Sequence, residues 1–443
     1  MNTLLSLSLS ILPAVPPTVL LIVLGFAVFS LTVLSLGALW CYGYGIYAAI
    51  DYLIHASSAD FSSPEAPDFS PRLTVLKPLC GADAATYSNL LSFCQQDYPD
   101  YQIIFAVLSA ADPCIEVVQR LIRQFPERDL QLVISNGAVG PNPKIDNLIN
   151  AARSAKHSLW VIADSDIRVG SDYLQQIVQP FRYPGVGIVT CPYRSQAKGW
   201  VATLEALGAA TELHPGILMA RRIEGVHFAL GSTVAIRQDL LTQLGGFEII
   251  ADDLADDFQF GRLPATLGYR VVLSNYVVEH ELTAHSTWEA LQRQIRQARG
   301  MCVSRPGSYM GQIITSGTVA SLLLGLLGGS IWNWTLLALV WLARLALAWV
   351  VGSLCLQDRS TQRYWWLLPI YDLISFSIRL SIWGCALVGH GVGQMAWRGQ
   401  RFRFLSDGKV QAIADLSGRQ QNPQNSQKAY ALPTLEEPTL KEI

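Results

Sequence analysis

Charged residues are scarce in this 443-residue chain and absent from two long stretches. They make up 15% of the residues, against 51% for hydrophobic residues, whereas ordinary soluble proteins have roughly 25% charged residues. Residues 1–50 contain no Asp, Glu, Lys or Arg, and neither do residues 306–343. A membrane-spanning helix needs about 20 consecutive apolar residues. The composition therefore excludes a purely soluble protein and predicts an integral membrane protein.

An excess of positive charge is also missing. The 32 basic and 34 acidic residues give a net charge of −2, so the chain has no polycationic surface of the kind that dominates nucleic-acid binding. The eight cysteines include no C-x-x-C pair, which favours free thiols in a reducing compartment. The N-terminal apolar run lacks a basic start and is too long for a signal peptide, so we expect a retained membrane anchor.

Changes in composition divide the chain into five segments. We expect a membrane anchor over residues 1–50 with a span near Thr18–Cys41, a proline-rich linker over 51–71, an α/β domain over 72–310, a C-terminal membrane region over 311–396, and a basic juxtamembrane segment with a disordered tail over 397–443.

The C-terminal membrane region contains three apolar runs, at Ile313–Gly329, Trp332–Leu356 and Trp365–His390. An even number of spans would keep the α/β domain and the basic segment on one side of the membrane. Two or three spans are therefore open, and the glycine-rich first run is the candidate for a re-entrant or interfacial segment.

Within residues 72–310, short β-rich runs alternate with helical patterns. The expected strands are Leu73–Leu79, Tyr101–Leu108, Leu130–Ser135, Leu159–Ala163 and Gly187–Cys191, and the expected helices are Ala84–Gln95, Pro113–Phe125, Lys144–Ala155 and Ser171–Pro180. This alternation is typical of βαβ crossovers in a largely parallel sheet. Ligands of such sheets bind beyond the carboxyl ends of the strands.

Two carboxylates follow the apolar strand Leu159–Ala163. Asp164 and Asp166 lie on the same side of an extended chain. Hard oxygen ligands suit Mg²⁺ or Mn²⁺, which takes one or two carboxylates and completes its shell with phosphate oxygens and water. The pattern predicts a metal site, although a surface turn also produces D-x-D.

Two further polar positions follow predicted strands. Asp112 comes after the second strand, where it is either a site residue or the N-cap of a helix that begins near Pro113. Lys144 lies in the loop GPNPKIDN (140–147) that opens a helix. The free N–H groups of a helix start and a lysine can hold phosphate, and a plain loop-to-helix turn is the alternative.

An acidic run and an arginine-rich run lie later in the domain. The run ADDLADDFQF (251–260) contains Asp252, Asp253, Asp256 and Asp257. It is either a solvated helix start or the source of a general base. The run LQRQIRQARG (291–300) carries Arg293, Arg296 and Arg299. These arginines suit either the membrane boundary or a clamp on a leaving diphosphate.

Eight short motifs occur together in one order. They are LKPLCG, FCQQDYP, AADP, GPNPKIDNLIN, ADSDIRV, ELHPG, LADDF and RQIRQ. This set resembles ceramide glucosyltransferase and the hopanoid-biosynthesis glycosyltransferase over about residues 72–310. The resemblance implies a Rossmann-like GT-A domain that transfers a hexose, glucose or N-acetylglucosamine, from a UDP-sugar to a membrane lipid with inversion.

The resemblance also implies roles for individual residues. Asp112 would contact the nucleotide, Asp166 with Asp164 the metal, and Asp257 would be the general base. Arg293 and Arg296 match the (Q/R)-x-x-R-W motif at the diphosphate, where Lys144 is a further candidate. His214, in ELHPG, would lie near the acceptor, with an ordinary buried histidine as the alternative.

The chain departs from the family pattern at one position. Gln297 stands where the (Q/R)-x-x-R-W motif ends in tryptophan, a residue expected to line the sugar or acceptor pocket. We therefore weigh the glycolipid transferase against two alternatives, a processive polysaccharide synthase of the same fold and a catalytically impaired lipid-binding or scaffold protein. The transferase is the main prediction, with its domain on the cytoplasmic side.

Overall fold

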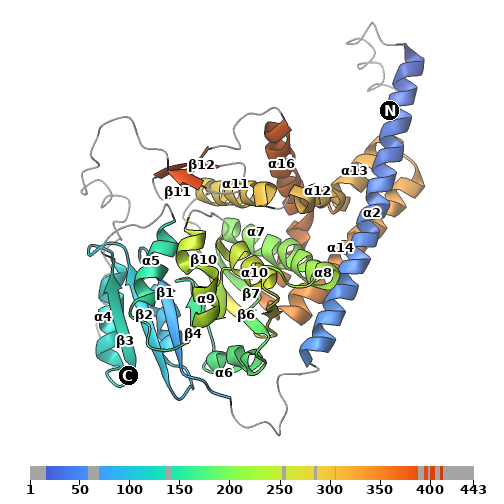
Figure 1. The fold of residues 1–443 in the computed structure, drawn as a ribbon. Coiled ribbons are helices and arrows are strands. Elements are labelled where there is room, and N and C mark those ends of the chain that lie inside the picture. The colour runs from blue at the N-terminus through green and yellow to red at the C-terminus, as the bar shows by residue number, and fades with distance from the viewer. Residues whose placement is uncertain are drawn as a thin grey trace, which may run out of the picture.

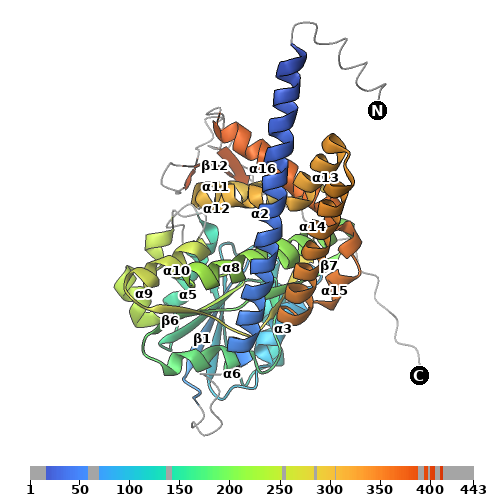
Figure 2. The same ribbon diagram turned by 90° about the vertical axis from the view of Figure 1, so that its right-hand side faces the viewer.

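The computed structural model describes residues 16–57, 69–135, 142–251, 256–283, 287–304, 306–387, 394–397, 400–404 and 410–412. An α/β domain packs beneath a group of long helices, and the helix α2 (Pro17–Ser57) extends well beyond both (Figure 1). Seen from the side, the N-terminal part of α2 stands clear of the domain (Figure 2). Residues 1–15 and 413–443, which include the predicted tail, lie outside the described residues.

The domain is built on a seven-stranded sheet with the order β3-β2-β1-β4-β8-β6-β9. Its strands are β1 (Leu73–Pro78), β2 (Tyr101–Val107), β3 (Asp129–Ile134), β4 (Leu159–Ala163), β6 (Val186–Thr190), β8 (Thr233–Arg237) and β9 (Arg270–Leu273). All neighbours pair in parallel except β8, which is antiparallel to β4 and β6. The five predicted strands and the largely parallel α/β sheet are confirmed.

Helices cover both faces of this sheet. Those that follow the predicted strands are α3 (Thr86–Cys94), α4 (Cys114–Gln124), α5 (Pro143–Ala152) and α6 (Tyr173–Val178), and α9 (Gln238–Leu244) and α10 (Asp256–Thr266) come later. The central strands are buried along their whole length. Because both faces are covered, these strands are mostly apolar and show no regular polar alternation. Two separate clusters of buried apolar residues form the core on the two faces.

A second, three-stranded sheet lies at the carboxyl end of β4. Its strands, in the order β5-β10-β7, are β5 (Ile167–Arg168), β10 (Val278–Thr283) and β7 (Tyr193–Lys198). Strand β5 follows Asp164-Ser165-Asp166 directly, and the N–H of Glu281 on β10 donates to the carbonyl of Asp166 at 2.9 Å. The small sheet therefore fixes the backbone of the predicted metal motif from the side opposite β4.

The predicted linker is wrong at its start, because α2 continues through residues 51–57 to Ser57. Ala48, Ala49 and Tyr52 are buried against the domain, and Asp51 forms an ion pair with Arg221 at 2.8 Å. These contacts stabilise the extra helical turns. At 41 residues and a rise of about 1.5 Å each, α2 is long enough to span a bilayer with its N-terminal part and to dock onto the domain with its C-terminal part.

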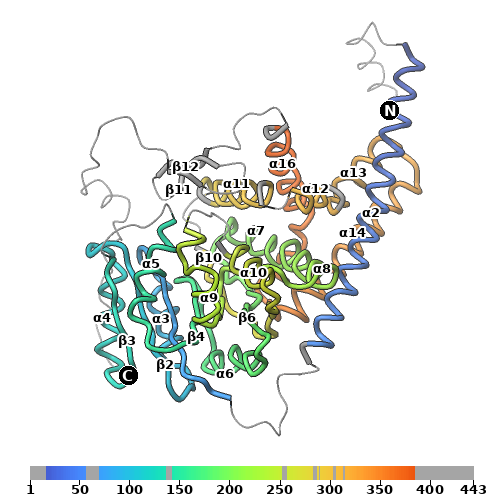
Figure 3. The backbone as a smooth tube through the Cα atoms, in the orientation of Figure 1, coloured from blue at the N-terminus to red at the C-terminus, as the bar shows by residue number. Residues whose placement is uncertain are grey.

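The C-terminal helices only partly match the predicted spans. They are α11 (Thr287–Ser304), α12 (Pro306–Ile314), α13 (Gly317–Gly328), α14 (Ile331–Trp349) with its π-helical continuation η4 (Val350–Cys355), α15 (Arg359–Gln362) and α16 (Leu368–Leu387). Figure 3 shows the path of the chain through these helices. Within the described residues, two helices are long and apolar enough to cross a membrane, Pro17–His55 and Ile331–Cys355. α16 is not among them.

The first apolar run forms a bent pair of helices. Pro306–Gln312 and Gly317–Gly328 meet at 41° and together qualify as a broken span or a re-entrant loop. Helix α13 has 12 residues, about 18 Å at 1.5 Å per residue, which is shorter than the roughly 30 Å hydrocarbon core. Beyond α16 come three short antiparallel strands, β11 (Gln394–Trp397), β12 (Gln400–Phe404) and β13 (Val410–Ala412). β11 lies at the end of the predicted membrane region, and β12 and β13 lie in the predicted basic segment.

Candidate active site

Asp164, at the carboxyl end of β4, is held by two lysines. The ammonium of Lys144, at the start of α5, lies 2.8 Å from the Asp164 carboxylate. The ammonium of Lys77, on β1, donates to the Asp164 carbonyl oxygen at 2.6 Å and lies 3.9 Å from the centroid of the Phe93 ring. Helix α5 begins here because Pro143 is its first residue and the Asn142 side chain caps it.

Lys77 is completely buried, and burial lowers the pKa of its ammonium to about 7. The nearby Asp166 and Asp164 oppose this shift because negative charges favour the protonated amine. A buried lysine beside two carboxylates at a strand end is unusual for a purely structural position. Lys77 belongs to the motif LKPLCG, but nothing in the sequence alone marks it as a site residue.

Asp166 pairs with a histidine that the sequence analysis did not identify. Its carboxylate lies 3.4 Å from Nε2 of His280 on β10. Burial opposes ionisation of both groups, but the mutual attraction outweighs it, so the pKa of Asp166 is lowered and that of His280 is raised. Each group therefore favours the charged form of the other.

The other oxygen of Asp166 meets the requirement for a metal ligand. Oδ1 is buried and has no hydrogen-bond partner among the described residues. An unpartnered carboxylate oxygen is costly to bury unless a ligand completes its coordination. No group of three or more His, Cys, Asp or Glu side chains gathers in the described part of the chain, but Mg²⁺ sites commonly use only one or two carboxylates with phosphate oxygens and water.

Tyr193, at the start of β7, lies at the centre of the acidic groups. Its ring packs edge-on against His214 and His280, with centroid distances of 4.8 and 5.2 Å. Its pKa is raised, mainly by burial and further by the negative charges of Asp257, Glu205 and Asp166. Tyr193 therefore links the β4 end, helix α10 and the helices near the membrane into one site.

Asp257 is positioned by close packing of α10. A Cβ at Gly261 would lie 2.2 Å from the Phe228 backbone, so only glycine allows α10 to approach the 228–231 segment. The Ala229 N–H donates to the Asp257 carbonyl at 3.2 Å, and Oδ2 of Asp257 lies 3.3 Å from the place a Cβ of Gly231 would occupy. Residues 252–255 of the acidic run lie outside the described residues, as does the side chain of Asp256.

Arg293 and Arg296 project from α11 towards a buried glutamate on α7 (Trp200–Gly208). Arg293 Nε lies 2.9 Å from Glu205 Oε1. Burial raises the pKa of Glu205, while Arg293, His280 and Arg296 oppose that shift. Glu205 thus holds the guanidinium of Arg293, while Arg296 and His280 act on the same carboxylate through their charge. Gln297, the next residue along α11, is exposed.

Asp112 occupies a separate place at the ends of β1 and β2. The Gly81 N–H donates to the Asp112 carboxylate and lies 3.1 Å from each of the two oxygens. The Cys114 N–H donates to Oδ1 at 2.9 Å. The bond to Cys114 ties the carboxylate to the first residue of α4, close to the capping role considered as the alternative, although Pro113 occupies the N-cap position itself. The structure therefore explains the position of Asp112 without a ligand, and its nucleotide contact stays a prediction.

His214 is buried, and both of its ring nitrogens bond to the backbone. Nδ1 donates to the Ala209 carbonyl at 2.8 Å, which leaves Nε2 to accept the Tyr193 N–H at 3.2 Å. Burial lowers its pKa to about 4. These contacts match the alternative of an ordinary buried histidine that orients Tyr193, and proximity to an acceptor stays a prediction.

We expect His214 to make the protein sensitive to acid. Folding lowers the pKa of His214 from 6.5 to about 4. Between pH 6.5 and pH 4, His214 therefore binds a proton in the unfolded chain but not in the folded chain. Stability is therefore lost as the pH falls from 6.5 to 4, by about 3 kcal/mol at about 1.4 kcal/mol per pH unit. Thermal unfolding in detergent micelles should show a weaker pH dependence for His214→Gln than for the wild type, and equal slopes would contradict this.

Together these contacts define a membrane-anchored α/β protein whose acidic site lies at the carboxyl ends of its strands, beside arginines on a helix that leads into the membrane region. The chain belongs to glycosyl transferase family 21, whose family model matches residues 36–410. The match confirms the family resemblance found in the sequence.

Similar proteins are ceramide glucosyltransferases. Ceramide glucosyltransferase 3 of Caenorhabditis elegans is 29% identical over 253 residues, which are 55% of this chain and 55% of that protein. Ceramide glucosyltransferase 1 of the same organism is 27% identical over 299 residues, 64% of this chain and 63% of that protein. The alignments thus span 55–63% of the length of these two curated relatives.

A solved structure also aligns with the chain. The mannosyltransferase PcManGT from Pyrobaculum calidifontis in complex with GDP-Man and Mn²⁺ covers 81% of this chain and 100% of its own, with 21% identity and a TM-score of 0.47. That score is too low to establish a shared fold, so the family match carries the assignment.

Proposed function

We propose that this protein transfers a hexose from a UDP-sugar to the hydroxyl group of a membrane lipid, with inversion at the anomeric carbon. Glucose and a ceramide-like lipid are the first choices because the similar proteins are ceramide glucosyltransferases; N-acetylglucosamine and a hopanoid remain within the proposal. The catalytic unit is residues 72–310, of the GT-A type.

One observation carries the proposal. The Asp166–His280 pair and the Glu205–Arg293 pair meet around Tyr193, and α11, which carries Arg293 and Arg296, packs against α16 beside the membrane helices. Groups suited to a diphosphate are thus placed where a lipid can arrive from the bilayer. This arrangement explains why a nucleotide-sugar site is built next to apolar helices.

In the proposed mechanism, Asp257 takes the proton from the lipid hydroxyl. The oxygen of that hydroxyl attacks the anomeric carbon of the sugar in the same step. The bond from that carbon to the diphosphate breaks, and UDP leaves with the electron pair. Arg293 and Arg296 stabilise its negative charge, while Lys144 keeps Asp164 in place and Asp112 is the proposed nucleotide contact. Glu205 and His280 are positioning residues for Arg293 and Asp166.

Asp166, with Asp164, would hold a divalent cation, Mg²⁺ or Mn²⁺. The unpartnered Asp166 Oδ1 supports this assignment, and oxygen ligands at a strand end suit both ions. When bound, such an ion neutralises charge on the diphosphate.

The activity is tested by incubating membranes that contain the protein with a panel of labelled UDP-sugars and analysing the lipids by mass spectrometry. We expect one hexose to be added to a lipid, and membranes carrying Asp257→Asn serve as the control. If UDP-sugars are consumed and only polymer or free sugar appears, the proposed acceptor is wrong.

We propose that Gln297 tunes specificity on the acceptor side. It is exposed on α11, and glutamine offers hydrogen bonds where tryptophan offers a flat stacking surface. Gln297→Trp should therefore change the ratio of lipid products or donors more than the total rate. Mass spectrometry with mixed acceptors measures this ratio; a fixed ratio with a changed rate would show that the position does not select substrates.

We propose that the protein is a multi-pass membrane protein with its α/β domain on the cytoplasmic side, where UDP-sugars occur. Arginines precede the membrane region at 293, 296, 299 and 305, as the positive-inside rule expects. A cysteine introduced at Ser62 should not react with a membrane-impermeant thiol reagent in intact cells, yet should react after permeabilisation. Labelling in intact cells would reverse the orientation.

A further inference from the structure

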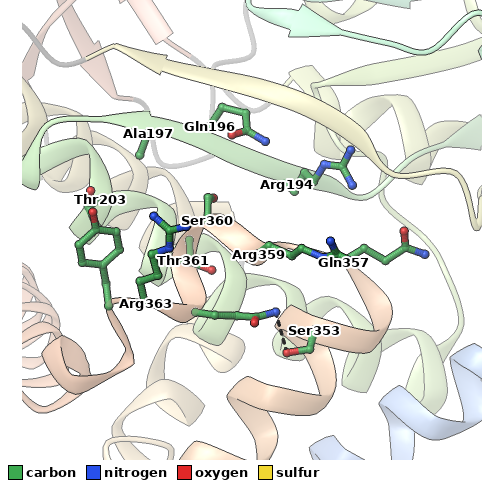
Figure 4. Close-up of a pocket in the computed structure, with 12 residues that line it drawn as sticks. Arg194, Gln196, Ala197, Thr203, Ser353, Gln357, Arg359, Ser360, Thr361 and Arg363 are labelled. Atoms are coloured by element: carbon green, nitrogen blue, oxygen red, sulfur yellow. Dashed lines mark hydrogen bonds between the residues drawn. The ribbon is translucent and has the colours of Figure 1, made fainter.

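A second polar pocket lies outside the candidate active site. It has a volume of about 820 Å³ and lies between strand β7 and the segment that follows the candidate span Ile331–Cys355. Figure 4 shows Arg194 entering from the strand while Gln357, Arg359 and Arg363 enter from the opposite wall. Nothing in the proposed transfer reaction uses these residues.

The pocket is strongly basic. Among the described residues that line it there is no carboxylate, but there are three arginines and the hydroxyl groups of Ser360, Thr361 and Tyr364. Arg194 shares its charge with Glu279 at 2.7 Å. The side chains of Arg359 and Arg363 are exposed and have no ion-pair partner in the described parts of the chain. Guanidinium groups match the oxygens of a phosphate group.

The wall that carries Arg359 and Arg363 is preorganised. Asp358 is buried and accepts the N–H groups of Ser360 and Thr361 at 3.0 and 3.2 Å, together with both of their hydroxyl groups. Gln357, just before it, has φ of +52°, a left-handed conformation that residues with side chains seldom adopt. The Gln362 amide also donates to Ser353 at 3.0 Å. Little ordering is therefore needed when an anion binds.

Exposed aromatic side chains occur near the end of the candidate span, and one of them, Tyr364, lines the pocket. Trp349 is 50% exposed, Trp366 is 67% exposed and Tyr364 is 39% exposed. Tryptophan and tyrosine gather at the membrane–water interface, where their rings lie at the level of the lipid headgroups. A pocket at the end of this candidate span would lie at headgroup depth, and this favours a phospholipid over a soluble anion.

We propose that this pocket binds the phosphate of an anionic phospholipid. Arg359 and Arg363 hold the phosphate from one wall, and Arg194 contributes from the opposite wall. The pocket is distinct from the candidate active site: successive residues of a strand point to opposite faces, and Ser195, between the pocket residues Arg194 and Gln196, lies 3.5 Å from Nδ1 of His280. Arg194 and Gln196 thus lie on the face of β7 opposite to Ser195 and His280.

The test compares lipid binding by the full chain, purified in a neutral detergent and measured by native mass spectrometry. The probes are phosphatidylglycerol, phosphatidylcholine and inorganic phosphate. We expect the wild type to retain phosphatidylglycerol in preference to phosphatidylcholine. Each arginine near an anionic lipid surface contributes about fivefold in affinity. The double variant Arg359→Gln with Arg363→Gln should therefore weaken phosphatidylglycerol binding by about 25-fold. Its binding of phosphatidylcholine should be unchanged.

The control is Arg120→Gln with Arg123→Gln, which removes the same charge from the exposed face of α4 and should leave the preference intact. An unchanged thermal midpoint shows that each variant is folded, and lysine at 359 and 363 should restore part of the affinity. Equal phosphatidylglycerol binding by the pocket variant and the wild type overturns the proposal. Displacement of the lipid by excess inorganic phosphate overturns the lipid assignment and leaves a soluble-anion site.

Discussion

Replacing Asp257 with asparagine is expected to lower lipid glycosylation by about 10²–10⁴-fold, the usual contribution of a general base. Asparagine keeps the shape of the side chain but cannot take the proton. The close approach of α10 through Gly261 and the Ala229–Asp257 hydrogen bond do not depend on the carboxylate, so the site should stay assembled. Binding of UDP, measured by calorimetry, should therefore be largely retained.

The matched control is Asp256→Asn, one residue earlier on the same helix. Neighbouring residues of a helix point about 100° apart around its axis, so only one of the two carboxylates can face the acceptor hydroxyl. Asp256→Asn should cost much less activity. If Asp256→Asn is the inactive variant, the two roles are reversed; if Asp257→Asn also abolishes UDP binding, Asp257 belongs to the donor site.

Removing the metal, or the carboxylate proposed to hold it, should have an effect of similar size. Excess EDTA should abolish transfer, and added Mg²⁺ or Mn²⁺ should restore it. Asp166→Ala should lower turnover by about 10²–10³-fold, as the loss of one preorganised charge-stabilising group commonly does, and it should weaken Mn²⁺ binding followed by electron paramagnetic resonance.

Asp129→Ala is the control for this variant, because Asp129 lies at the start of β3, away from the carboxyl ends, and pairs with Lys156 on the surface at 2.7 Å. It should bind Mn²⁺ and transfer sugar at the wild-type level. Full activity in excess EDTA would show that the transfer needs no metal ion. Asp166 would then act only as the partner of His280.

The sequence allowed the scaffold to be predicted because local patterns determine it. β4 is a five-residue apolar run followed by Asp164 and Asp166, and the structure has it at Leu159–Ala163 as predicted. Strand β8 was not predicted, because its antiparallel place between β4 and β6 depends on long-range pairing. The helical continuation of α2 was also missed, since it depends on packing against the domain.

The partners of the site residues were harder to predict. His280 and Glu205 meet Asp166 and Arg293 across 114 and 88 positions of sequence, and no local spacing links such pairs. Tyr193 gave no signal either, because a tyrosine at the start of a strand is ordinary until His214, His280 and three acidic groups surround it. The order of the motifs was enough to locate the site in the sequence. Which of its side chains are buried, and which of them pair with each other, became clear only from the fold.

The central claim is a direct, inverting transfer of the sugar to a lipid. It is tested most directly by supplying purified protein in nanodiscs with UDP-glucose, whose anomeric linkage is α, and with ceramide, and then determining the anomeric configuration of the glycolipid by NMR. The account predicts a β-linked glucosylceramide that forms with the wild type and is nearly absent with Asp257→Asn. An α-linked product, or an equal yield of product from the two proteins, would contradict it.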